Sequence, residues 1–266
     1  MTSFTPETTL ATTGKWFSTS NTPAYYISDE STPYLLLTTK MNNYSVSGLN
    51  TSSTYSASYT VTPTANSSIE VSFNAFPVHP YGTFPTVSTQ VAGLCDSNNN
   101  YILPYTENMS FTVTASKTTT NDGNNPLTMG CIGYIFDNIP LYAGMDATGY
   151  NPVAFECGDI FGGYPSSTDY HRHIISPPIL NWLVDNEIRV VGFMIDGYPI
   201  VSPFLITVNS VTRVIETADL NINHGIVDTI TFTINNVELT YDFYYVATFD
   251  FPYTIASFYG TPVTLV

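Results

Sequence analysis

The stretch ITFTINNVELTY at residues 230–241 carries the clearest structural signal in the chain. Hydrophobic and polar residues alternate on both sides of Asn235-Asn236, as they do in strands that bury one face. Two consecutive asparagines suit a two-residue hairpin turn, because asparagine tolerates the left-handed backbone conformation that such a turn requires. The stretch therefore predicts an antiparallel β-hairpin.

Similar strand-like stretches recur along the chain, and helical periodicity is scarce. They lie at Tyr34–Thr39, Tyr55–Thr62, Ser68–Phe73 and Ser110–Ala115. Only Pro177–Glu187, which starts with proline, has the pattern of a short helix. We therefore predict an all-β protein, an antiparallel β-sandwich or barrel-like domain with at most a short helix.

A nine-residue motif occurs twice, as GYIFDNIPL at residues 133–141 and as GFMIDGYPI at residues 192–200. Each copy has the composition of a strand, a turn and a second strand, so the repeat predicts two pseudo-symmetric hairpins. Asp137 and Asp196 occupy the same position in the two copies. They could form a general acid and base pair, although aspartate before Asn or Gly is also ordinary turn chemistry.

The composition favours a folded protein that lives outside the cytoplasm. Hydrophobic residues make up 43% of the 266 residues, which is ample for a core, whereas only 10% are charged. An average soluble protein has about 25% charged residues, so Ser, Thr, Asn and Tyr must cover this surface. We divide the chain into residues 1–58, a Ser/Thr/Asn/Tyr-rich β segment or small β module, and residues 59–266, the main β domain.

The charge balance excludes some partners. With 21 acidic and 6 basic residues the net charge is −15, which argues against nucleic acid and against an anionic membrane surface. No apolar run approaches the roughly 20 residues of a membrane-spanning helix, so we expect no membrane insertion. Few ion pairs are available to be lost at low pH, and the sparse charge therefore predicts an acid-tolerant fold.

The start of the chain lacks the basic and apolar regions of a signal peptide. We expect an extracellular, cell-surface or virus-particle protein whose signal has been removed or which leaves the cell within a particle. The three cysteines, Cys95, Cys131 and Cys157, cannot all pair within one chain and form no CxxC motif. Either one disulfide and one buried thiol or three free thiols fit this number.

The four histidines are the candidate metal ligands, and they are His79, His171, His173 and His224. His171 and His173 are separated by one residue, so in a strand their side chains would point to the same face. Two neighbouring imidazoles can chelate a divalent transition metal such as Zn or Cu. Two histidines with satisfied hydrogen bonds at a strand edge would give the same pattern.

Several segments resemble the YHYH domain family, which is named for a Tyr-His-Tyr-His string preceded by Gly-Gly-His-Pro and followed by Asp-Gly-Phe-Pro-Ile. The matching stretches here are DIFGGYP at 159–165, YHRH at 170–173 and GFMIDGYPI at 192–200. Weaker likenesses extend the resemblance over roughly residues 60–266, at 76–85, 223–225, 241–246, 251–253 and 260–262. All four histidines fall within these segments.

The resemblance implies a metal site with departures from the family pattern. Tyr164 stands where the family has the histidine after Gly-Gly, Arg172 replaces the second tyrosine of the string, and Asp242 stands where a histidine is often found. The implied ligands are the four histidines, with Tyr164 and Asp242 as oxygen ligands. Arg172 would point to the opposite strand face, where we expect it to pack over an aromatic ring.

Three functions fit these observations. The one we favour is a structural or adhesive protein of a surface or virion that binds assembly partners or cell-surface glycans, since tyrosine-rich β surfaces suit such contacts. An oligomer is compatible with this role. The alternatives are a metal-dependent hydrolase or redox enzyme that uses His171 and His173 with His79 or His224, and a non-catalytic domain that a metal stabilises.

Overall fold

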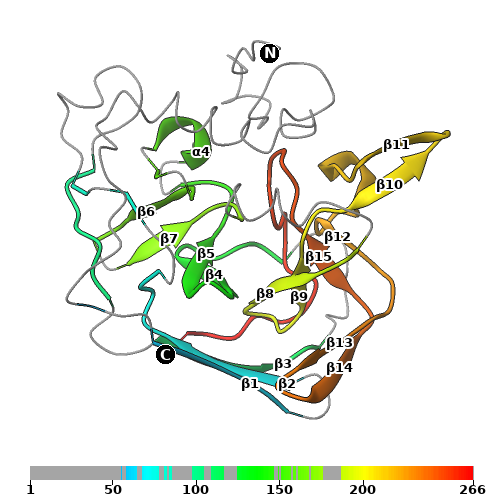
Figure 1. Cartoon of the computed structure of the whole chain (residues 1–266), viewed down its shortest axis with the longest axis horizontal. Coiled ribbons are helices and arrows are strands. Elements are labelled where there is room, and N and C mark those ends of the chain that lie inside the picture. The colour runs from blue at the N-terminus through cyan, green and yellow to red at the C-terminus, as the bar shows by residue number, and fades with distance from the viewer. Residues whose placement is uncertain are drawn as a thin grey trace.

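The computed structural model of the chain shows two packed layers of β-sheet (Figure 1). Its regular structure is nearly all strand, which confirms the predicted all-β sandwich. The structure describes residues 55, 58–64, 68–77, 81–82, 84–85, 98–104, 109–116, 125–146, 149, 151–156, 158–159, 161–167, 169–175 and 187–265. The predicted strand at 34–39 lies outside these residues, as does the predicted helix at 177–187 except for its last position.

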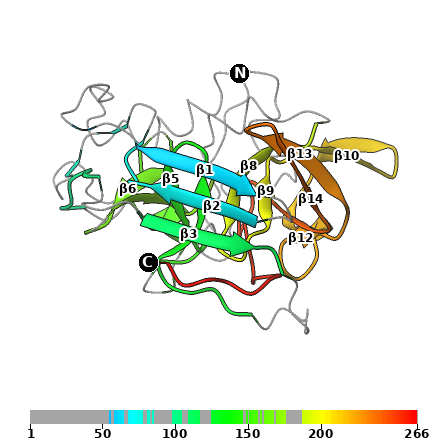
Figure 2. The same cartoon turned by 90° about the horizontal axis from the view of Figure 1, so that it is seen from below.

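One layer is a three-stranded antiparallel sheet, seen face-on in Figure 2. Its strands, in spatial order, are β1 (Tyr59–Thr64), β2 (Ser68–Phe73) and β3 (Met109–Thr114). Along β2 the side chains of Ile69, Val71 and Phe73 are buried and the residues between them are more exposed. The alternation in the sequence therefore predicted both the strand and its buried face.

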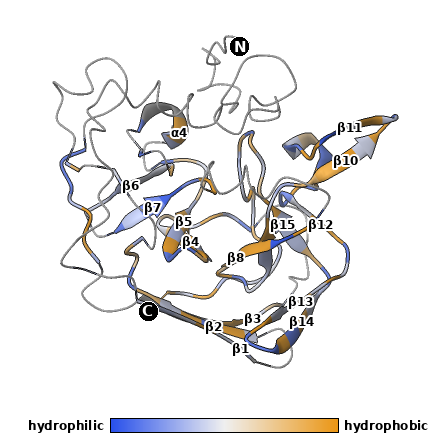
Figure 3. Cartoon of the chain, viewed as in Figure 1, coloured by the Kyte–Doolittle hydropathy of each residue, from blue (hydrophilic) through white to orange (hydrophobic). Residues whose placement is uncertain are grey.

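The other layer is an eight-stranded sheet with the order β12-β15-β9-β8-β4-β5-β7-β6. Its strands are β4 (Cys131–Ile135), β5 (Ile139–Tyr142), β6 (Gly163–Pro165), β7 (Tyr170–Arg172), β8 (Val190–Met194), β9 (Pro199–Val201), β12 (Gly225–Ile226) and β15 (Tyr244–Val246). The central strands β4 and β8 are hydrophobic and buried along nearly their whole length (Figure 3), as expected for strands covered on both faces.

A pseudo-twofold axis passes between β4 and β8. These strands pair antiparallel with Tyr134 opposite Phe193, and these two residues occupy the same position in the nine-residue repeat. Phe136 N donates to Val191 O at 3.0 Å, and the symmetry-related Ile195 N donates to Ile132 O at 2.9 Å. The repeated motif thus forms the predicted pair of hairpins, β4–β5 and β8–β9, related by this axis.

The symmetry extends beyond the repeated motif to the rest of the eight-stranded sheet. β5 pairs in parallel with β7, and β9 pairs in parallel with β15, at the equivalent partners Leu141↔Arg172 and Ile200↔Tyr245. In each half an outer strand completes the unit: β6 pairs antiparallel with β7, and β12 pairs antiparallel with β15. The sheet is therefore built from two copies of one four-stranded unit.

The turns that lead into the outer strands are also equivalent. Asp159 Oδ1 accepts from the backbone N–H of Phe161 at 2.9 Å and of Gly163 at 3.3 Å. Asn221 Oδ1 accepts in the same way from Asn223 at 3.0 Å and Gly225 at 3.1 Å. Both turns contain a left-handed residue, Gly162 with φ of 76° in one and His224 with φ of 70° in the other.

Two further hairpins leave the eight-stranded sheet. They are formed by β10 (Leu205–Val208) with β11 (Val211–Val214), which projects from the body (Figure 1), and by β13 (Ile230–Ile234) with β14 (Val237–Tyr241). Asn235 and Asn236 both have positive φ, so the predicted hairpin and its turn are confirmed. The tip of this hairpin reaches β1, where Asn235 Nδ2 donates to Val61 O at 2.8 Å.

Helical structure within the described residues is limited to two single turns. The helix α4 (Pro152–Phe155) has proline in its first turn and Asn151 as its N-cap, with the Asn151 side chain accepting from Val153 N at 3.1 Å. The 3-10 turn η2 (Thr217–Asp219) follows β11. No helix among the described residues has the length and apolar character needed to cross a membrane.

The close approach of β4 and β8 explains why glycine occupies the first position of both repeats. A Cβ atom at Gly192 would lie 2.2 Å from Tyr134 O, and one at Gly133 would lie 2.8 Å from Phe193 O. Both contacts are with backbone of the paired strand, which cannot move without breaking the ladder. A side chain at either position would therefore separate the two halves of the sheet.

We predict that Gly192→Ala lowers the free energy of unfolding by about 3 kcal/mol, because overpacking against backbone is poorly relieved. Gly130→Ala is the matched control. A Cβ atom there has no neighbour within 4 Å, and its cost is limited to about 1 kcal/mol of strain from its φ of 86°. Urea denaturation measures both values, and equal losses would contradict the role assigned to Gly192.

Candidate functional site

The structure brings His171, His173 and Tyr164 together on one side of β7. Tyr164 in β6 lies directly opposite His171 in the strand ladder, and the rings of the two histidines are 5.2 Å apart between centroids. The Tyr164 hydroxyl is 2.8 Å from His173 Nε2. Three of the six predicted ligands are therefore neighbours, as strand alternation and the resemblance led us to expect.

Both ring nitrogens of His173 already have protein partners. Nδ1 contacts the carbonyl oxygen of Ala143, which can only accept, so Nδ1 carries the proton and Nε2 accepts from the Tyr164 hydroxyl. Burial, and secondarily the neighbouring His171, lower the pKa of His173 to about 3. Burial also raises the pKa of Tyr164 above its usual value. The pair is therefore neutral at physiological pH.

His171 is held between an aromatic ring and a carboxylate. Its ring stacks on Tyr142 with centroids 4.1 Å apart, and its Nδ1 lies 3.5 Å from Asp169 Oδ1, longer than a direct hydrogen bond. Asp169 also accepts from the hydroxyls of Tyr142, at 2.9 Å, and Ser166. Burial would raise the pKa of Asp169, but His171 and these hydroxyls outweigh it and lower the pKa.

The remaining predicted ligands lie elsewhere or outside the described residues. His224 belongs to the other half of the sheet, where its Nε2 is 3.0 Å from Thr217 Oγ1 and 3.1 Å from Thr248 Oγ1, and burial lowers its pKa to about 4. His79 is outside the described residues. Within the described part of the chain, no three His, Cys, Asp or Glu side chains are grouped to hold a metal ion. The Zn or Cu site stays a prediction.

Asp137 and Asp196 do not form the acid–base pair that their repeat positions allow. Because β4 and β8 are antiparallel, the turns that follow them lie at opposite ends of the pair. Asp137 forms an ion pair with Arg172. The main partner of Arg172 is therefore this carboxylate and not the aromatic ring that we expected from the sequence. Asp196 instead accepts from the Tyr245 hydroxyl at 2.6 Å and Gly260 N at 2.9 Å, and burial raises its pKa to about 6.

Cys131 has the properties of a structural thiol. It is a free cysteine, fully buried in β4, and its Sγ lies 3.1 Å from Gly133 O. Burial raises its pKa to about 12, so almost none of it is the reactive thiolate at neutral pH. Cys95 and Cys157 lie outside the described residues, so both alternatives, one disulfide or three free thiols, stay predictions.

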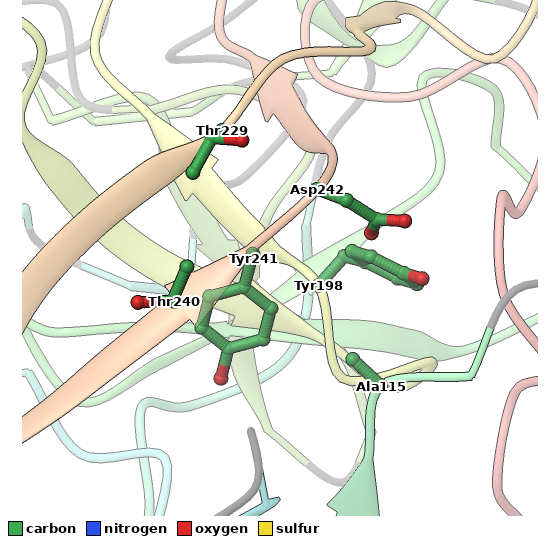
Figure 4. Close-up of a pocket in the computed structure, with 6 residues that line it drawn as sticks. All are labelled: Ala115, Tyr198, Thr229, Thr240, Tyr241 and Asp242. Carbon is green, nitrogen blue, oxygen red and sulfur yellow. The ribbon is translucent and has the colours of Figure 1, made fainter.

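A pocket of about 250 Å³ surrounds Asp242, the sixth predicted ligand (Figure 4). It lies where β14 ends, beside the turn after β8, and is lined by Ala115, Tyr198, Thr229, Thr240, Tyr241 and Asp242. Asp242 supplies the only charge among these residues. No histidine contributes to the lining, so Asp242 is separate from the cluster around His171.

Two tyrosines give this pocket an aromatic character. The rings of Tyr198 and Tyr241 are 6.2 Å apart between centroids and inclined by 57°. Burial, and secondarily the negative charge of Asp242, raise the pKa of Tyr198 above its usual value. The buried Tyr241 hydroxyl has no hydrogen-bond partner among the described residues. Sequence reasoning found only Asp242, because nothing distinguishes these two residues from the other tyrosines of the chain.

No family model, no curated protein and no solved structure matches this chain. The likeness to the YHYH family is thus neither supported nor contradicted, and the function of the chain is inferred from its own residues.

The buried ionisable groups predict that the fold loses stability in acid. The pKa of a histidine in the unfolded chain is 6.5, whereas in the folded chain it is about 3 for His173 and about 4 for His224. Between these values the unfolded chain binds protons that the folded chain does not, so stability falls as pH falls. Asp196 acts in the opposite direction between pH 6 and 3.8, because its folded carboxyl group holds a proton more tightly. Asp159, whose pKa burial also raises, acts in the same direction as Asp196, whereas Asp169, whose pKa is lowered, acts with the histidines. We expect the two histidines to outweigh the two carboxyl groups whose pKa is raised.

We expect the free energy of unfolding to decrease between pH 7 and pH 4.5 by an amount on the order of 3 kcal/mol. Urea denaturation at the two pH values measures it. His224→Gln should make the decrease smaller and Asp196→Asn should make it larger. A stability curve that is flat over this range, as the sparse charge alone predicts, would show that the histidines are not buried in the neutral form.

Proposed function

We propose that this chain is a binding module of a cell surface or virus particle that recognises uncharged saccharides at the pocket around Asp242. The observation that carries the proposal is the lining of that pocket, which combines two tyrosine rings, two threonines and one carboxylate. Its volume of about 250 Å³ is just below the ~300–1,000 Å³ of pockets for drug-sized ligands, which suits one sugar ring.

The chemistry of each lining group matches a part of a sugar. Tyr198 and Tyr241 are each 3% accessible, so they form rigid aromatic walls against which the apolar part of a sugar can pack at little cost in side-chain entropy. A carboxylate accepts hydrogen bonds from two adjacent hydroxyls, and bonds to charged groups are the stronger ones.

Charge restricts the ligand further. Asp242 has no cationic neighbour in the pocket lining, and the whole chain carries a net charge of −15. Phosphorylated, sulfated or acidic sugars would therefore be repelled, whereas neutral sugars would not. The sparse surface charge and the abundance of Ser, Thr, Asn and Tyr support a surface or particle location for the module.

The chemistry of the buried side chains favours a binding role over a catalytic one. His173 and Tyr164 are neutral and bonded to each other, Cys131 is a poor nucleophile, and Asp137 is neutralised by Arg172. None of these groups is in the pocket lining. The family likeness leaves room for a metal at His171 and His173, and this remains the alternative to the saccharide-binding role.

We predict that Asp242→Asn weakens binding of a neutral saccharide by about 10- to 100-fold, because a charge-assisted hydrogen bond is worth about 1.5–3 kcal/mol. A glycan array identifies the ligand and calorimetry measures its affinity for the wild type and the variant. Glu238→Gln removes the same charge from an exposed position of β14, the strand that precedes Asp242, outside the pocket, and should leave binding unchanged.

The proposal fails if no neutral saccharide binds the wild type, or if the two variants bind equally well. Preference for acidic glycans would also contradict it, because the lining offers no cation to receive them.

A further inference from the structure

The hydroxyl group of Tyr134 has no structural role that the fold explains. Tyr134 lies on the pseudo-twofold axis, is fully buried, and its hydroxyl has no hydrogen-bond partner among the described residues. Leaving a buried hydroxyl unpaired is destabilising. The symmetry-related residue is Phe193, which fills the equivalent position without a hydroxyl. The core therefore accepts phenylalanine here, and the oxygen of Tyr134 calls for a different explanation.

Tyr134 lies at the base of a groove of about 490 Å³ between β1 and the tip of the β13–β14 hairpin. The described residues that line it are Tyr59, Thr60, Val61, Thr62, Tyr134, Phe136, Ile234 and Asn235. The groove has about twice the volume of the pocket around Asp242. It combines three aromatic rings with an asparagine amide, and none of the residues that line it is charged.

The free edge of β1 is poorly suited to bind a peptide as an added strand. Ser58 O accepts from Asn74 N in β1's neighbour, so by alternation the backbone groups of residues 59, 61 and 63 point away from β2. Of these, Pro63 has no N–H, and Val61 O already accepts from Asn235 Nδ2. Proline on an edge strand protects it against strand addition.

The lining also argues against ionic and purely apolar ligands. Its residues offer no side chain of either charge to pair with an ion, and they include the Tyr134 hydroxyl, which an apolar ligand would leave unpaired. A ligand with an apolar face and several hydroxyl groups suits both the aromatic rings and this hydroxyl. The exposed ring of Tyr59, 48% accessible, can pack on such a face.

From the groove and its unpaired hydroxyl we infer that the chain has a second saccharide-binding site, in which the Tyr134 hydroxyl bonds to the sugar directly or through one water. This inference rests on the proposed saccharide-binding function and adds a second, larger site that has no carboxylate. The site takes a neutral oligosaccharide, since its volume exceeds that of the pocket for one ring.

Tyr134→Phe tests the inference, because it removes one oxygen atom and installs the residue found at the symmetric position. We expect the melting temperature of the free variant to equal or exceed that of the wild type. We also expect calorimetric titration with chitotetraose and with mannotetraose to show two sites per chain in the wild type and an affinity about tenfold lower at one site in the variant. Tyr101→Phe, at an exposed tyrosine outside the groove, is the matched control.

The outcomes separate this inference from the proposed function. If Asp242→Asn abolishes one site and Tyr134→Phe changes neither, the proposed function stands and the second site is wrong. A loss of stability in Tyr134→Phe with unchanged binding would show that the hydroxyl is structural, and Tyr59→Ala, which alters an exposed ring, should then also leave binding unchanged. If neither oligosaccharide binds the wild type at either place, or if only extended peptides occupy the groove, the inference is overturned.

Discussion

The antiparallel pairing of β4 with β8 is the contact on which the rest of the fold depends. It joins two equivalent four-stranded units into one sheet, and it needs glycine at both Gly133 and Gly192 because each lies against backbone of the other strand. The aromatic residues on the axis then pack against the three-stranded sheet, where the ring centroids of Tyr134 and Phe73 are 4.7 Å apart. Without this pairing each unit would expose a hydrophobic edge strand.

The two units keep the same backbone contacts while their buried chemistry differs. Arg172 and Tyr245 occupy equivalent positions and both bond to the turn aspartate of their own unit, so an ion pair in one half replaces a hydroxyl–carboxyl bond in the other. By the same correspondence, His171 in one unit is equivalent to Tyr244 in the other. The backbone therefore does not require histidine at this position, and the cluster of His171 with His173 occurs in one unit alone.

The sequence predicted what depends on neighbouring residues. Alternation located β2, β13 and β14, and the asparagine pair located the turn between the last two. The nine-residue repeat revealed two hairpins but not the four-stranded unit, because the turns at Asp159 and Asn221 share a hydrogen-bond pattern but only a short and weak sequence likeness, DIFGG against NINHG. The parallel pairing of β5 with β7 joins segments some thirty residues apart, which no local pattern specifies.

The residues of the two candidate pockets could likewise be predicted from the sequence only in part. Asp242 was found through a family likeness, whereas Tyr198 and Tyr134 could not be found, since a chain with 20 tyrosines gives no signal as to which ones line a pocket. These two tyrosines are distinguished by their surroundings in the tertiary structure. Tyr198 lines a pocket together with the carboxylate of Asp242, and Tyr134 carries a hydroxyl that its symmetric counterpart lacks. The internal repeat thus helps to identify a candidate site, because a buried hydroxyl that is absent from the other copy and has no hydrogen-bond partner among the described residues is a candidate for binding.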